Sequence, residues 1–169
     1  MSFNIRGRAW KFGDNISTDL IMPSFAYMKV GHNYKKLAKY VMYTNRPNWT
    51  EKVERGDIII GGKNFGCGSS RPAAGPLKAL GISCIIAESI SRIFFRNSIS
   101  LGLPVLEAPN IQRFCVENDI LEVTLVKGTI KNLSTGKKMK IKPIPKNSPP
   151  MQILEAGGLS AFLKEEILQ

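Results

Sequence analysis

Residues 58–72 read Ile-Ile-Ile-Gly-Gly-Lys-Asn-Phe-Gly-Cys-Gly-Ser-Ser-Arg-Pro. The three isoleucines predict a buried strand, because β-branched apolar residues favour the extended backbone. The glycines that follow predict a loop whose backbone can come very close to a ligand. We expect a helix to begin directly after the loop, with a serine as its N-cap and Pro72 at its first position.

A strand, glycine loop and helix start in this order can bind an anion. The N-terminus of a helix offers unpaired N–H groups and the positive end of the helix dipole, and Arg71 adds a fixed charge. The plain structural alternative is a glycine loop and a capped helix with no ligand. The run lacks the Gly-Lys-[Ser/Thr] ending of a P-loop and does not fit Gly-x-Gly-x-x-Gly, so it indicates a carboxylate or phosphate rather than a nucleotide.

The length and composition are those of a globular domain. We expect residues 1–169 to form a single domain, and 43% hydrophobic and 22% charged residues fit that class. No apolar run approaches the ~20 residues that span a bilayer, so no membrane contact is expected. The first six residues contain no apolar signal core. With reduced cysteines, this predicts a cytoplasmic protein.

The cysteines do not indicate a metal site. There are three, Cys67, Cys84 and Cys115, and no two are spaced as in a zinc knuckle. Cys84 and Cys115 sit in apolar surroundings and are interpreted as core residues. Cys67 belongs to the glycine loop, where its role stays open.

The chain is strongly basic, with a net charge of +11. This charge is consistent with nucleic-acid binding, with an enzyme that attracts anions, or with a merely basic surface. Several lysines cluster in residues 137–146, but no aromatic platform or helix-turn-helix pattern accompanies them. Solvated surface charge is therefore favoured, and no nucleic-acid partner is expected.

The order of the elements predicts an α/β fold. Residues 5–12 read as a strand, 24–34 as a loop and 35–43 as a helix. Strands at 58–60, 82–87 and 103–107 alternate with helices at 72–80 and 88–101, which predicts a parallel sheet with ligands at the carboxyl ends of its strands. Alternation over 119–141 predicts a small antiparallel β meander. Two closing helices, divided by Gly157-Gly158, follow an extended linker over 143–150.

Two further polar features lie before the glycine loop. Ser17-Thr18-Asp19 is interpreted either as a capped turn or as a polar corner of an active site. His32 is the one histidine, and a lone histidine in a loop is more often solvated than catalytic.

Five stretches in the right order resemble the small subunit of the aconitase-family hydro-lyases, such as isopropylmalate isomerase and homoaconitase. They are residues 7–19, 61–71, 92–97, 102–105 and 155–159. The run Asn-Phe-Gly-Cys-Gly-Ser-Ser-Arg over 64–71 is the most specific of them.

The resemblance implies a swivelling domain with three layers, β/β/α, and a mainly parallel sheet. It also implies a larger partner subunit, in a heterodimer or heterotetramer, that carries a [4Fe–4S] cluster. The substrate would be a small di- or tricarboxylate, as in leucine biosynthesis. This chain itself is expected to bind no cofactor and no metal.

The family's roles carry over to matching positions. Ser69 matches the catalytic base, and Ser70 and Arg71 match the neighbours that hold the substrate carboxylate. Asp19 matches an acidic residue at the edge of the active site and is taken as catalytic. Three further residues are expected to contact substrate; they are Gly68 in the glycine loop and Tyr27 and Lys29 in the family's specificity loop.

Two departures from the family pattern bear on the substrate. The family usually continues Ser-Ser-Arg with Glu-His-Ala, whereas this chain has Pro72-Ala73-Ala74. Lys29 stands where an arginine is usual, and a lysine cannot bind a carboxylate in the bidentate manner. Isopropylmalate is the expected substrate, with homoaconitase, citramalate-type and 2,3-dimethylmalate dehydratase chemistry as alternatives. A nucleic-acid-binding module and a non-catalytic regulatory subunit are the alternatives from other classes.

Overall fold

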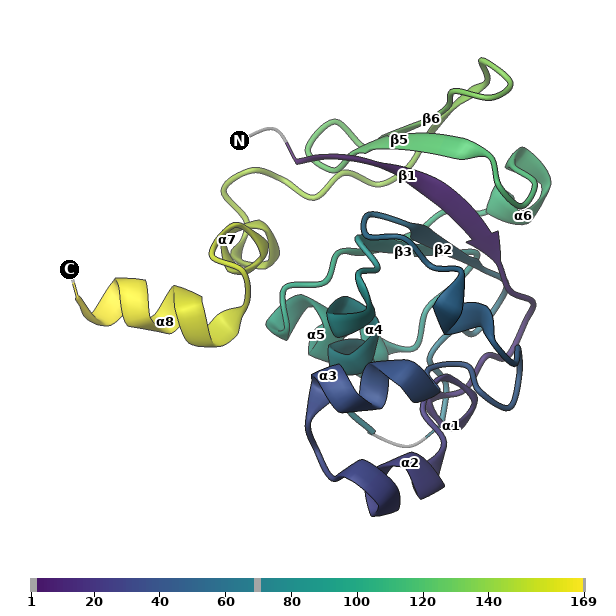
Figure 1. The fold of residues 1–169 in the computed structure, drawn as a ribbon. Helices are drawn as coiled ribbons and strands as arrows, with labels where there is room; N and C mark the ends of the chain where they lie inside the picture. The colour runs from purple at the N-terminus through teal and green to yellow at the C-terminus, as the bar shows by residue number, and fades with distance from the viewer. Residues whose placement is uncertain (1–2, 69–70, 169) are drawn as a thin grey trace.

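The computed structural model describes residues 3–68 and 71–168, and its centre is a mixed sheet (Figure 1). Within that part of the chain the strand order is β4-β3-β2-β1-β5-β6-β7. The strands β1 to β4 run parallel, and they span Asn4–Lys11, Ile58–Gly61, Cys84–Ala87 and Val105–Glu107. The strands β5 to β7 run antiparallel, and they span Ile120–Thr124, Thr129–Asn132 and Lys138–Lys140.

The isoleucines of β2 are fully buried because both faces of the parallel strands are covered. Ile59 packs into the core beneath the helices, while Ile58 and Ile60 pack into a second core with Leu121 and Val123 of β5. The sheet therefore curls over itself, and helices, parallel strands and antiparallel strands form three layers. This confirms the predicted α/β fold with its parallel sheet and antiparallel meander.

The helices divide between the two cores. Those that cover the first core are α1 (Thr18–Ile21), α2 (Ser24–Val30), α3 (Tyr34–Leu37), α4 (Ala74–Leu80) and α5 (Arg92–Ser100). Short 3-10 turns span Ala38–Tyr40 and Trp49–Glu51. The second core receives residues from α6 (Ile111–Phe114) and α7 (Pro149–Glu155).

Residues 24–34 were predicted to form a loop, and this prediction is wrong. They contain α2, which begins after Pro23 and ends at Gly31 with a φ of 67°. Ala26 is buried, and Tyr27 and Val30 pack beside it on the first core. That spacing places all three on one helical face, a pattern that the polar residues between them obscured.

The helix after the glycine loop also differs from its prediction. It begins at Ala74 with Ala73 in the N-cap position, so neither a serine nor Pro72 occupies the predicted place. Pro76 lies in the first turn, where the missing N–H group costs no helical hydrogen bond. In α5 (Arg92–Ser100) the buried residues are Phe94, Ser98 and Ile99, and Ile93 is 53% exposed.

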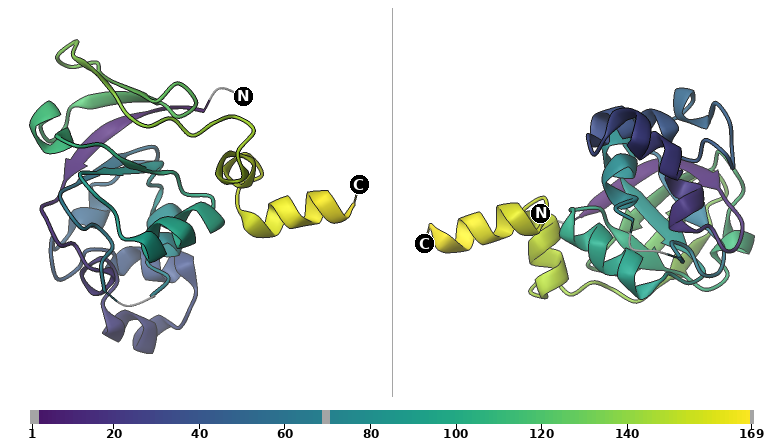
Figure 2. Two further views of the ribbon diagram at one scale, coloured as in Figure 1. Left: turned by 180° about the vertical axis from the view of Figure 1, so that it is seen from behind. Right: turned by 90° about the horizontal axis from the view of Figure 1, so that it is seen from below.

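The chain ends in α7 and α8 (Leu159–Ile167), divided by Gly157 and Gly158 as predicted. Helix α8 extends away from the body of the molecule (Figures 1 and 2). No helix in the described part of the chain is long and apolar enough to cross a membrane.

A glycine substitution tests how tightly the glycine loop packs on α5. Gly66 has a φ of 75°, and an added Cβ would overlap the Phe94 ring, whereas Gly136 has a φ of 78° with open space around it. Gly136→Ala should cost about 1 kcal/mol through backbone strain alone. Gly66→Ala should cost about 3 kcal/mol or more, because overpacking adds to the strain. Denaturant unfolding followed by tryptophan fluorescence measures both, and equal losses would contradict this packing.

Candidate active site

The loop after β1 and the glycine loop after β2 are joined by main-chain hydrogen bonds. Together these bonds run along residues 13–18 and 62–67 like a short ladder. They join Gly62 N to Gly13 O (3.0 Å), Asn15 N to Lys63 O (2.8 Å), Gly66 N to Ile16 O (2.7 Å) and Thr18 N to Cys67 O (2.8 Å). Parallel strands end at the same edge of a sheet, so the two loops meet where ligands bind in α/β proteins.

Helix α1 starts inside this paired region. The Ser17 side chain accepts a hydrogen bond from the Leu20 backbone N–H at 3.1 Å and is the N-cap. Thr18 is 2% exposed, and Asp19 occupies the exposed side of the first turn. The triplet is therefore a capped turn, the first of the two interpretations that the sequence left open.

Asp19 forms an ion pair with Arg71. The Arg71 Nε lies 3.2 Å from Asp19 Oδ1, and the side chains are 34% and 59% exposed. The ion pair uses Nε of the guanidinium, and the terminal amino groups have the geometry to bind a further anion. The pair orients the positive charge and leaves it open to ligand.

Tyr27 lies close enough to Arg71 for the two side chains to interact electrostatically. Its hydroxyl oxygen is buried and has no hydrogen-bond partner among the described residues. Burial raises the pKa of Tyr27, the nearby Tyr34 raises it further, and Arg71 opposes the shift. The hydroxyl therefore stays protonated at neutral pH and can donate a hydrogen bond. His32 is exposed and lies beside the Tyr27 ring, with 5.4 Å between centroids.

The other residues that the sequence predicted for the site are Gly68, Lys29, Ser69 and Ser70. Gly68 is exposed, has a φ of 99°, and faces Ser17 and Thr18. The Lys29 ammonium lies over the Tyr40 ring, 5.6 Å from its centroid. Ser69 and Ser70 lie outside the described residues. The structure thus gathers Asp19, Arg71, Gly68 and Tyr27, and it places Lys29 on an aromatic neighbour.

Sequence reasoning missed Tyr34, which borders the site. Its ring lies against Gly75 of α4 so closely that an added Cβ would overlap it. A glycine inside a helix costs about 1 kcal/mol relative to alanine, so Gly75 was a signal of close packing.

The cysteines do not fit an iron–sulfur cluster in this chain. Cys84 and Cys115 are buried in the second core, and burial raises the pKa of both thiols, that of Cys115 to about 11. Cys67 lies in the glycine loop and is partly exposed. Across residues 3–68 and 71–168, no group of three or more His, Cys, Asp or Glu side chains is arranged to hold a metal ion.

The fold and the paired loops correspond to a known domain. A family model of the aconitase C-terminal domain matches residues 4–110, which include the four parallel strands and the glycine loop.

Full-length relatives narrow this class. The isopropylmalate/citramalate isomerase small subunit of Methanocaldococcus jannaschii is 49% identical to this chain, and the alignment covers 98% of this chain and 96% of the relative. The 3-isopropylmalate dehydratase small subunit 1 of Thermotoga maritima is 48% identical and covers 95% of each chain. A crystal structure of 3-isopropylmalate dehydratase from Methanocaldococcus jannaschii has a TM-score of 0.90 at 38% identity, and the match covers 98% of this chain and 96% of that one.

The chain belongs to the aconitase family, and within it to the 3-isopropylmalate dehydratase small subunits, which are hydro-lyase subunits. This confirms the resemblance that the sequence motifs indicated.

The exposed ion pair should contribute little to stability. Asp19→Ala should change the free energy of unfolding by less than about 1 kcal/mol, as is usual for surface ion pairs. Asp57 is the matched control: it is 3% exposed and accepts hydrogen bonds from Arg8, Trp10 and the Glu54 backbone. Asp57→Ala should cost about 3 kcal/mol or more, because it leaves buried donors unpaired. Denaturant unfolding measures both. Equal losses would mean that the Asp19–Arg71 pair supports the fold instead.

Proposed function

We propose that this chain is the small subunit of an isopropylmalate isomerase, and that it acts with a larger subunit to interconvert 2- and 3-isopropylmalate. The observation that carries the proposal is the Asp19–Arg71 pair beside the glycine loop. The pair offers a partly exposed guanidinium, held through its Nε, at the edge of the sheet where ligands bind. Family membership supplies the reaction class.

The reaction removes water from a hydroxy acid and adds it back one carbon away. A base takes the proton from the carbon beside a carboxylate, and the C–H electron pair becomes the double bond. The C–O bond on the neighbouring carbon breaks, and the hydroxyl leaves as water after it gains a proton. Water then adds with its hydroxyl and its proton exchanged between the two carbons, which gives the isomer.

Arg71 would bind the substrate carboxylate and stabilise the negative charge that grows on it during proton removal. Asp19 would hold the guanidinium in place through Nε, so that the terminal amino groups face the ligand. Ser69 is the proposed base, with Ser70 and the Gly68 backbone as further carboxylate contacts. Tyr27 would donate a hydrogen bond from its hydroxyl to substrate. Lys29 would add positive charge at the rim.

The larger subunit would carry the [4Fe–4S] cluster, which supplies Lewis-acid chemistry at the substrate hydroxyl. The residues of this chain would form the other half of the site and bring base and carboxylate contacts to it. We propose that residues 1–169 act as one swivel domain in that assembly. The free cysteines support a reducing compartment such as the cytoplasm.

Citramalate is a second candidate substrate. The relative from Methanocaldococcus jannaschii is named an isopropylmalate/citramalate isomerase small subunit and is 49% identical. Both substrates are branched hydroxy diacids, so one Arg71 contact serves either. Homoaconitase and 2,3-dimethylmalate dehydratase chemistry stay as further alternatives.

Reconstitution with the cluster-bearing larger subunit tests the proposal. Turnover is followed anaerobically at the ultraviolet absorbance of the unsaturated acid, with isopropylmalate, citramalate, homocitrate and dimethylmalate compared. Isopropylmalate should give the highest kcat/KM, and Ser69→Ala should lower kcat by about a thousandfold, in the range of a lost general base.

Ser134→Ala is the matched control, because Ser134 is exposed in the loop between β6 and β7. It should leave kcat unchanged. No turnover of any of the four acids by a stable, cluster-loaded complex would refute the proposal, and full activity in Ser69→Ala would refute the role of Ser69.

Tyr27→Phe separates function from stability. The Tyr27 hydroxyl is buried without a hydrogen-bond partner among the described residues, so its removal should leave the free energy of unfolding unchanged or raise it by about 1 kcal/mol. The same change should lower kcat/KM about tenfold, as the loss of one hydrogen bond to substrate does. Tyr43→Phe is the control, because Tyr43 is half-exposed and packs on Phe25. A Tyr27→Phe variant that loses stability and keeps its activity would contradict the assignment.

A further inference from the structure

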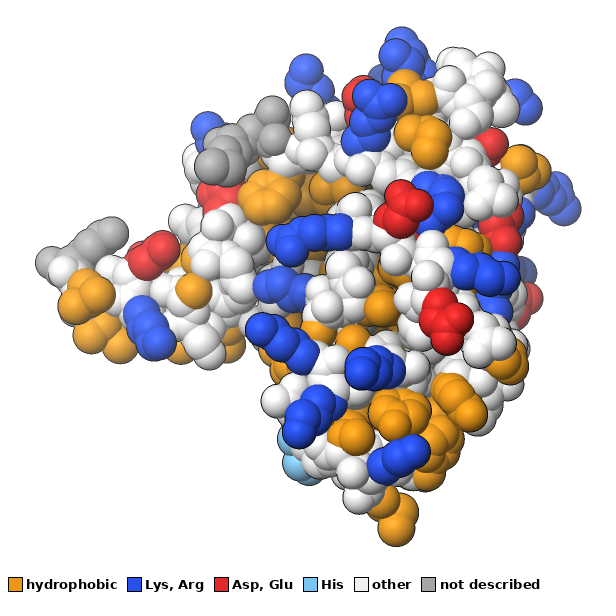
Figure 3. Space-filling model, viewed as in Figure 1, with side chains coloured by type: hydrophobic (Ala, Val, Ile, Leu, Met, Phe, Trp, Pro, Cys, Tyr) orange, Lys and Arg blue, Asp and Glu red, His pale blue; other side chains and the backbone are white. Residues whose placement is uncertain are grey.

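Helix α8 has an apolar stripe that is largely exposed in the described chain. None of its residues is buried. Leu159, Leu163 and Ile167 are 37%, 48% and 81% exposed, and their spacing of four places them on one face of the helix. Figure 3 shows hydrophobic side chains along the projecting helix. A helix shorter than about 12–15 residues is marginal in water without packing, so this nine-residue helix needs a partner surface.

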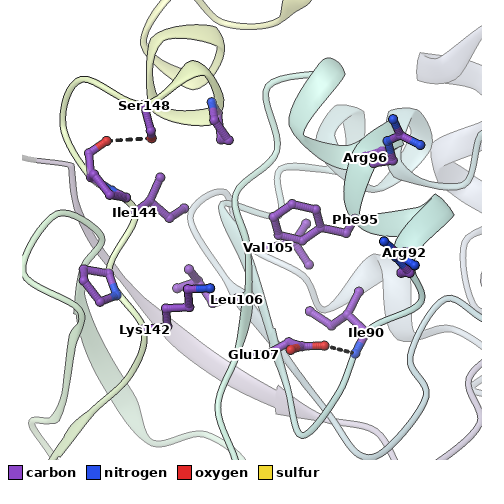
Figure 4. A pocket seen from close by; sticks show the side chains of 13 residues that line it. Ile90, Arg92, Phe95, Arg96, Val105, Leu106, Glu107, Lys142, Ile144 and Ser148 are labelled. Atoms are coloured by element: carbon purple, nitrogen blue, oxygen red, sulfur yellow. Dashed lines mark hydrogen bonds between the residues drawn. The ribbon is translucent and has the colours of Figure 1, made fainter.

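The molecule also has an open groove with a volume of about 670 Å³. It runs between α5, β4 and residues 142–150. Its floor is apolar and consists of Ile90, Phe95, Val105, Leu106 and Ile144. Figure 4 shows Arg92 and Arg96 on one side of the groove and Lys142 on the other. The one carboxylate among the lining residues, Glu107, accepts a hydrogen bond from the Ile90 backbone at 2.8 Å.

The stripe and the groove match each other in polarity and charge. The volume lies within the ~300–1,000 Å³ of pockets that bury a drug-sized ligand, which is enough room for apolar side chains of a helix. Glu166 lies beside the stripe, three residues after Leu163, and would meet the arginines at the rim. Glu165 lies on the opposite side of α8. No residue of α8 lines the groove of its own chain.

We propose that the groove binds helix α8 of a second copy of this chain, with Leu163 and Ile167 on the apolar floor and Glu166 against Arg92 and Arg96. When α8 of each chain binds in the groove of the other, the result is a two-fold dimer with two identical helix–groove contacts. The turn at Gly157 and Gly158, with φ values of 86° and 135°, directs α8 outward as such an exchange requires. This dimer contact is independent of the catalytic reaction.

Sedimentation equilibrium of the full chain over a wide concentration range tests the proposal. The chain should dimerise, and Leu163→Asp should weaken the dimer by about tenfold or more, as loss of a buried interface residue does. Arg96→Glu in the groove should weaken it similarly, and so should Glu166→Lys in α8. Glu165→Lys is the matched control and should have no effect. All four side chains are exposed, so the substitutions should leave the fold intact. Circular dichroism verifies that the variants stay folded.

A mixing experiment identifies the two surfaces as partners. Leu163→Asp chains keep an intact groove, and Arg96→Glu chains keep an intact α8. The mixture should form a heterodimer with one intact contact, more stable than either variant dimer alone. A chain that stays monomeric, a dimer that ignores the α8 or groove changes, or an α8 change that affects only binding to the larger subunit would each overturn the proposal.

Discussion

The main-chain pairing of residues 13–18 with residues 62–67 is the constraint on which the site depends. Each loop alone contains glycines and turn residues that allow many backbone conformations. When the two loops are paired, they hold α1 at a fixed position against the glycine loop. This position places Asp19 beside Arg71. A carboxylate and a guanidinium that are 52 positions apart in the chain are thereby held together by backbone geometry. The packing of Gly66 on Phe94 then anchors this unit to α5.

The proposed site would be half of an active site in physical terms. A serine takes a proton from carbon only where water is excluded and the alkoxide is stabilised, yet Asp19 and Arg71 are partly exposed in this chain. A covering surface must therefore come from elsewhere, which agrees with the proposed larger subunit. The surplus of positive charge, +11 overall, would draw a dicarboxylate toward Arg71. The buried Tyr27 hydroxyl has no hydrogen-bond partner within residues 3–68 and 71–168, a cost that a bound substrate would remove.

Local patterns predicted the sheet well, because three buried isoleucines and glycine stops leave few alternatives. They failed where tertiary contacts decide the outcome. The period of α2 was hidden because only Ala26, Tyr27 and Val30 pack on the core. The start of α4 moved to Ala74, since proline and serine preferences for helix starts are weak beside packing. The approach of Asp19 to Arg71 was available only through the family motif, because residue spacing carries no information on loop pairing.

The most direct measurement is a crystal structure of the complex of this chain and its larger subunit with the unsaturated acid intermediate bound. The account predicts that one substrate carboxylate lies within hydrogen-bond distance of the terminal amino groups of Arg71, while Nε of Arg71 stays on Asp19. It also predicts the Tyr27 hydroxyl in contact with substrate. A substrate bound away from Arg71, or an Asp19–Arg71 pair that breaks in the complex, would contradict it.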